Sequence, residues 1–117
     1  MAAELFVDTS GWYPVVVRTL AEHGTLTRAL RDRVRAGARV VTTNLVVAEM
    51  HALLLRRVGR ETAMTFVRSV GESPNLVVAS TADLERAAVR DWLEPFDDQT
   101  FSLTDAVSFA VMAERGI

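Results

Sequence analysis

Short apolar runs alternate along this chain with longer segments in which apolar residues recur every three or four positions. The short runs are rich in β-branched residues and predict strands at residues 5–7, 39–42 and 76–78. The longer segments predict helices, and a loop is expected at 95–101. The predicted helices cover residues 11–22, 25–36, 44–58, 60–70, 80–93 and 102–115. Strands separated by helices indicate an α/β fold with a central parallel sheet.

Residues at the helix starts support two of these boundaries. Asn44 is in position to cap the helix at 44–58. Ser80, followed three residues later by Asp83, resembles a capping box for the helix that follows the third strand. The predicted starts of these two helices are therefore explained by residues that favour the N-cap position.

Composition removes several classes of chemistry. The chain has 117 residues, of which 50% are hydrophobic and 24% are charged, as expected for one globular domain. It has no cysteine, so disulfide scaffolds, Cys-ligated zinc and cysteine nucleophiles are excluded. All 13 basic residues are arginine, which excludes mechanisms that need a Schiff-base or P-loop lysine. The net charge of −2 is unlike that of a simple nucleic-acid binder, and the absence of a signal peptide or membrane span predicts a cytoplasmic protein.

Three carboxylates lack the arginine neighbour that several other acids of this chain have. Asp8 follows the first strand, at the sheet edge where ligands bind in such folds, and a turn or cap is the alternative. Glu49 has apolar neighbours on its helix face, where an ionised side chain is costly unless paired or metal-bound. A position at the edge of the apolar stripe is the alternative for Glu49. Asp105 opens the last, mostly apolar helix and also matches a capping box with Ser102.

Brought together, these three acids would need a cation. Two carboxylates about 4 Å apart repel by about 4 kcal/mol in a protein-like dielectric. The chain has no cysteine, and its two histidines, His23 and His51, are far apart in sequence, so oxygen ligands favour Mg²⁺ or Mn²⁺ over zinc. A divalent ion in an open carboxylate site activates water and stabilises charge on a phosphate.

Polar residues beside the acids are candidates for a supporting role. Thr9, Ser10, Asn44 and Thr104 could hydrogen-bond the site or its substrate, although capping explains them equally well. Arginines cluster on two predicted helices and offer phosphate contacts, a solvated face or a patch for an acidic partner. These arginines are Arg28, Arg31 and Arg35 on one helix, and Arg56, Arg57 and Arg60 near the end of another.

Three motifs resemble those of PIN-domain ribonucleases. The first is LFVDTSGW at residues 5–12, which looks like the first strand and catalytic turn of that family. The second is VTTNLVVAE at 41–49, which ends on an acidic helix residue, and the third is SLTDAVSFAVM at 102–112. All three occur in order over nearly the whole chain. The resemblance is closest to the VapC-type toxins of bacterial toxin–antitoxin modules.

This resemblance implies a metal-dependent endoribonuclease on a three-layer α/β/α sandwich with a parallel sheet. It implies that Asp8, Glu49 and Asp105 bind the metal ion, with Thr9 or Ser10 as a supporting hydroxyl. It also implies an RNA substrate, a cognate antitoxin and a homodimer.

One departure from the family pattern follows the third motif. The family usually continues into another strand that carries a fourth acidic residue, so residues 1–117 are expected to form a single PIN-like domain that is incomplete at its C-terminus. This departure leaves a second hypothesis, a PIN-like module that binds RNA or a protein partner with weak or no cleavage. A response-regulator receiver and a haloacid-dehalogenase-like phosphatase are excluded, because the chain lacks lysine and lacks an aspartate two residues after Asp8.

Overall fold

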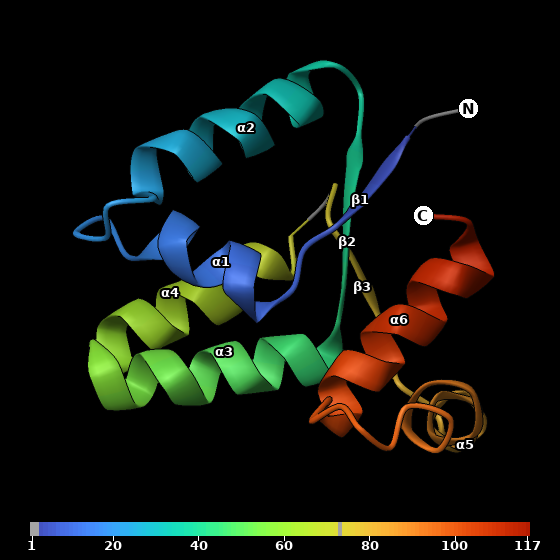
Figure 1. Ribbon diagram of the computed structural model, residues 1–117. Helices are drawn as coiled ribbons and strands as arrows, with labels where there is room; N and C mark the ends of the chain where they lie inside the picture. The colour runs from blue at the N-terminus through green and yellow to red at the C-terminus, as the bar shows by residue number, and fades with distance from the viewer. Residues whose placement is uncertain (1–2, 73) are drawn as a thin grey trace.

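The computed structural model describes residues 3–72 and 74–117 and has a sheet between two layers of helices (Figure 1). The sheet consists of β1 (Glu4–Phe6), β2 (Arg39–Thr43) and β3 (Leu76–Val78), all parallel, in the spatial order β1-β2-β3. Parallel neighbours need crossover connections, and two helices lie between each consecutive pair of strands. The predicted α/β class with a parallel sheet is confirmed.

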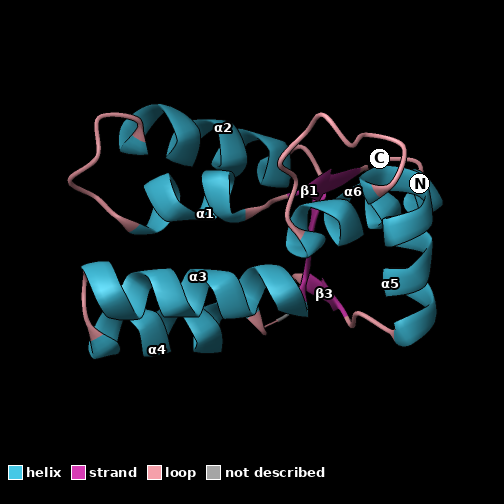
Figure 2. Ribbon diagram, turned by 60° about the horizontal axis from the view of Figure 1, so that its bottom comes forward, coloured by secondary structure: helices cyan, strands magenta, loops and turns pink. Residues whose placement is uncertain are grey.

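Helices cover both faces of this sheet (Figure 2). On one side lie α1 (Thr9–Val16), α2 (His23–Arg35), α3 (Asn44–Arg57) and α4 (Arg60–Val70). On the other side lie α5 (Ala82–Ala88), a π-helical turn η1 (Val89–Leu93) and α6 (Leu103–Arg115). The structure is therefore the three-layer α/β/α sandwich that the family resemblance implied. Within the described residues, none of these helices is both long and apolar enough to cross a membrane.

The alternation of side chains along β2 divides the interior into two cores. Val40 packs toward α1–α4 with Met50 and Leu54, which are fully buried. Val41, the next residue, packs toward α5 and α6 with Val107. Successive strand residues point to opposite faces, and a central parallel strand is buried on both. A short β-branched run is therefore enough to hold the two helical layers on the sheet.

Two helices are capped one residue away from the predicted position. Thr43, rather than Asn44, caps α3 by accepting from the Val46 N–H at 3.1 Å. Thr81, rather than Ser80, caps α5 in the same way. The two displaced residues bind each other instead, since the Ser80 N–H donates to Asn44 Oδ1 at 2.8 Å. This bond ties the turn after β2 to the turn after β3.

The first helix is offset from its predicted range of 11–22. It begins at Thr9, because Asp8 supplies the cap, and it ends at Val16. The Nδ1 of His23 donates to the carbonyl oxygen of Pro14 at 2.8 Å, so a side chain satisfies a carbonyl left free at the helix end. His23 thus has a structural role, and the chain after α1 forms a loop that borders the cavity described below.

An ion-pair network at the amino end of the strands ties α6 to the sheet. The Glu4 carboxylate accepts from Arg115 at 2.7 Å and from Arg39 at 2.9 Å. Hydrogen bonds from Arg115 and then Arg39 lower the pKa of Glu4 from 4.5 to about 2. The network lies at the sheet edge opposite the acidic residues that the motifs single out.

Candidate active site

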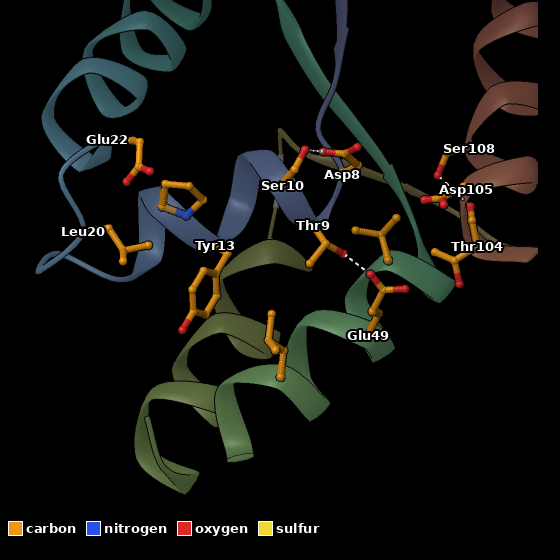
Figure 3. Close-up of a pocket in the computed structure, with 13 residues that line it drawn as sticks. Asp8, Thr9, Ser10, Tyr13, Leu20, Glu22, Glu49, Thr104, Asp105 and Ser108 are labelled. Carbon is orange, nitrogen blue, oxygen red and sulfur yellow. Dashed lines mark hydrogen bonds between the residues drawn. The ribbon is translucent and has the colours of Figure 1, made fainter. Parts of the chain in front are cut away.

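A cavity of about 420 Å³ lies at the carboxyl end of the strands, where α1, α3 and α6 begin. Its walls include all three acids that the sequence singled out, Asp8, Glu49 and Asp105 (Figure 3). The amino ends of helices carry partial positive charge, which favours carboxylates there. The helices after β1 and β2 carry Asp8 and Glu49 to this edge of the sheet, and α6, which follows a loop, brings Asp105 to it.

Asp8 caps a helix with one carboxylate oxygen and leaves the other accessible. It is the N-cap of α1, and its Oδ1 accepts from Ser10 Oγ at 2.7 Å and from the Gly11 N–H at 3.2 Å. The residue is exposed, and within the described chain its Oδ2 has no hydrogen-bond donor. The predicted cap and a site role are thus compatible, because each uses a different oxygen.

Glu49 is not buried on the apolar stripe of its helix, which corrects the expectation from its apolar neighbours. The residues of α3 that enter the core are Val46, Met50 and Leu54, and Glu49 lies exposed at the edge of that stripe, facing the cavity. The Thr9 hydroxyl donates to its Oε1 at 2.7 Å across 40 residues of sequence. An exposed carboxylate needs no buried partner, so its orientation rests on this bond to α1 (Figure 3).

Asp105 forms the capping box that the sequence predicted. Its N–H donates to Ser102 Oγ, and its Oδ2 accepts from the Ser102 N–H, both at 3.0 Å. Thr104 also lines the cavity, and its carbonyl accepts from the Ser108 hydroxyl one turn later at 2.9 Å. The box holds the Asp105 carboxylate at the start of α6 while leaving its Oδ1 without a donor among the described residues.

The three acids share one arrangement: one oxygen is held by the protein and the other is left without a protein donor within the described residues. Carboxylate oxygens of this kind suit a hard divalent cation. In residues 3–72 and 74–117, however, no three His, Cys, Asp or Glu side chains come close enough together to form a direct cage around one ion. Magnesium usually keeps several waters and takes only one or two carboxylates. The donor set therefore fits a hydrated ion better than a closed three-acid cage.

The structure adds cavity residues that the sequence did not single out and removes one that it did. Tyr13, Glu22 and Ser108 line the cavity with the acids, whereas the Asn44 side chain is held at the Ser80 turn and does not line it. Helix periodicity could have identified two of them, because Tyr13 lies one turn after Thr9 and Ser108 lies one turn after Asp105. The position of Glu22 could not have been found this way, because it depends on where α1 ends.

Comparisons with known proteins identify the family of this chain. Residues 5–117 match the family model described as PIN domain. Two relatives are named 23S rRNA-specific endonuclease VapC20 and come from Mycobacterium tuberculosis, strains CDC 1551 / Oshkosh and ATCC 25618 / H37Rv. Each is 37% identical to this chain over 113 residues, which cover 97% of this chain and 83% of the relative. The crystal structure of Mycobacterium tuberculosis VapC20, described as a Sarcin-Ricin loop cleaving toxin, matches at 37% identity with a TM-score of 0.86, covering 96% of this chain and 83% of that chain.

Proposed function

Because this chain belongs to the PIN-domain family, we propose that it is a metal-dependent endoribonuclease and the toxin of a toxin–antitoxin pair. The observation that carries the proposal is that Asp8, Glu49 and Asp105 line one cavity, each with an oxygen left free by the protein. The structural bonds of these carboxylates occupy one oxygen each and do not explain why all three acids line the same cavity. Hydrolysis of an RNA phosphodiester accounts for the family, the fold and the acids together.

In this proposal, Asp8, Glu49 and Asp105 hold Mg²⁺ or Mn²⁺, partly through water. When bound, the ion supplies the positive charge that activates a water molecule and stabilises a phosphodiester under attack. No lysine is present to take that part. The acids therefore serve an anionic substrate only through the cation that they bind.

The residues around the acids orient them. The Thr9 hydroxyl holds Oε1 of Glu49, and the Ser10 hydroxyl holds Oδ1 of Asp8, each at 2.7 Å. These bonds leave the opposite oxygen of each carboxylate directed to ion, water or substrate. A carboxylate with a free oxygen is also a suitable acceptor for the proton of the attacking water.

The relatives suggest the substrate and partners. They are named for action on 23S rRNA, and we propose ribosomal RNA as the substrate class of this chain too. The proposal includes a cognate antitoxin that covers the cavity, a homodimer and a cytoplasmic location, where the RNA is found. Light scattering on the purified chain tests the dimer, and co-purification with the product of a neighbouring reading frame tests the antitoxin.

Metal binding and RNA cleavage test the enzyme directly. We expect calorimetry to detect Mn²⁺ or Mg²⁺ binding at millimolar ion, and we expect labelled 23S rRNA fragments to be cut only when metal is present. Asp8→Asn and Asp105→Asn are the matched variants, because an asparagine oxygen can still accept the capping hydrogen bond. Loss of cleavage in both, with unchanged thermal unfolding, supports the proposal.

Two results would contradict it. Cleavage by Glu49→Gln at the wild-type rate under single turnover would remove Glu49 from the site. RNA binding without metal binding or cleavage would instead favour the second hypothesis, a non-cleaving PIN-like module.

A further inference from the structure

Charge is divided unequally between the two helical layers. Residues 1–70, which form β1, β2 and α1–α4, contain 10 arginines and 6 acidic residues. Residues 71–117, which form β3, α5, η1 and α6, contain 3 arginines and 9 acidic residues. The small net charge of the whole chain therefore conceals a basic layer and an acidic layer on opposite sides of the sheet. A polyanion such as RNA is attracted to the first and repelled by the second.

Ion pairing increases the difference in unpaired positive charge between the two helical layers. Arg86, Arg90 and Arg115, the three arginines after residue 70, all pair with carboxylates. Among the ten arginines before residue 71, only Arg39 has a carboxylate within 4.0 Å in the described part of the chain. Arg18 and Glu22, for example, are four residues apart but form no ion pair in the described part of the chain. The positive charge of the α1–α4 layer is thus left for an external partner.

One of these arginines contacts a residue that lines the cavity. The Arg57 guanidinium lies over the Tyr13 ring, 5.7 Å from its centroid. Tyr13 lines the cavity together with the acids, at the end away from Asp105 (Figure 3). The ring is half-buried against the first core, while Arg57 is exposed at the last turn of α3. An aromatic ring beside an exposed arginine is typical of sites for single-stranded nucleic acid.

We propose that Tyr13 and Arg57 form a nucleotide subsite beside the cleavage site, an inference that rests on the proposed ribonuclease function. The RNA strand runs from the three acids along the cavity toward the corner between α3 and α4. A base packs against Tyr13, and the adjoining phosphate binds Arg57. The exposed carboxylate of Glu22 also lies on the cavity wall and repels a phosphate beside it. The phosphate is therefore expected beside Arg57 instead. The acidic α5–α6 layer excludes the opposite route.

The test measures binding separately from cleavage. A short fluorescein-labelled single-stranded RNA is titrated with the full chain in EDTA, over a range of salt concentrations, and followed by anisotropy. Arg57→Gln removes the phosphate contact, and Tyr13→Leu removes the aromatic face while keeping an apolar side chain for the core. Tyr13→Phe keeps that face, and Arg86→Gln makes the same charge change as Arg57→Gln on the acidic layer.

We expect Arg57→Gln and Tyr13→Leu each to weaken RNA binding about tenfold, since a stacked base contributes on the order of that factor. Arg57→Gln should also lower the magnitude of the salt slope by about 0.7, the value for one phosphate contact on a single strand. Tyr13→Phe and Arg86→Gln should bind as the wild type does.

Equal effects of Arg57→Gln and Arg86→Gln would overturn the subsite, as would equal affinities of Tyr13→Leu and Tyr13→Phe. Failure of the proposed function gives a different result, because the wild-type chain would then not cleave RNA in Mg²⁺ or Mn²⁺. A wild-type chain that cleaves, with variants that bind unchanged, refutes the subsite alone.

Discussion

Asp105 takes part in the capping box at the start of α6 and, in the proposed reaction, also binds a metal ion. A pair of variants separates these two roles. Asp105→Asn keeps an oxygen that accepts from the Ser102 N–H, so the capping box survives while the ion loses a charged ligand. Ser102→Ala removes the hydroxyl that accepts from the Asp105 N–H but leaves the carboxylate. We expect the first variant to lose activity and keep stability, and the second to lose stability and keep activity.

The magnitudes follow from the cap and from the ion. Loss of a Ser cap costs about 1 kcal/mol of unfolding free energy, which lowers the Tm of a domain of this size by about 4 °C. In Asp105→Asn the lost charge at the helix start costs less than about 1 kcal/mol of unfolding free energy in EDTA. A lost metal ligand should slow single-turnover cleavage at least about a hundredfold, which corresponds to about 2.7 kcal/mol.

The assay pairs thermal unfolding in EDTA with single-turnover cleavage of a labelled 23S rRNA fragment in Mn²⁺. Wild-type cleavage by Asp105→Asn would refute the metal role of Asp105 and leave only the cap. Loss of cleavage by a folded Ser102→Ala protein would show that the cap itself is required for activity. Either result would contradict the division of the carboxylate into one structural and one free oxygen.

Other expected outcomes test the neighbouring contacts and the fold. Thr9→Val should slow single-turnover cleavage about tenfold with little change in Tm, because Glu49 loses the donor that orients it at 2.7 Å; an unchanged rate would contradict that role. Leu54→Ala should lower the unfolding free energy by about 2–5 kcal/mol in urea titrations, because the side chain is fully buried. For Glu4, whose two arginine partners lower its pKa to about 2, the stabilisation is present above pH 4.5 and is lost as the pH falls toward 2. Glu4→Gln should therefore have a Tm that declines less than that of the wild type over that range in circular dichroism melts, and parallel curves would refute this reasoning.

Most of the elements could be predicted from local pattern. The strands at the sheet centre and the helices after them appear within a few residues of their predicted positions, because periodicity and propensity act over short stretches of chain. The errors also have local causes. Thr43 and Thr81 cap their helices in place of the neighbouring residues. The first helix ends earlier than predicted, and the His23 side chain donates to the Pro14 carbonyl oxygen near its end.

The candidate site could be predicted in its residues but not in its geometry. Motif order identified Asp8, Glu49 and Asp105, and the structure brings all three to one cavity. Burial on an apolar stripe was the wrong reason for selecting Glu49, because that side chain lies at the exposed edge of the stripe. Its carboxylate accepts a hydrogen bond from the Thr9 hydroxyl, which no pattern within α3 can reveal.

The sequence by itself determined the fold class and the family and singled out the three acids as candidates, because hydrophobic period and short motifs are properties of neighbouring residues. Only the tertiary structure decided which carboxylate oxygens stay free, that Tyr13 shares the cavity with those acids and that Arg57 lies over the Tyr13 ring. The same holds for charge. Both halves of the chain show their excess in the printed sequence, but packing on opposite faces of one sheet turns that excess into a basic and an acidic layer. Contacts between residues far apart in sequence depend on how whole layers pack, and that information is absent from any single segment.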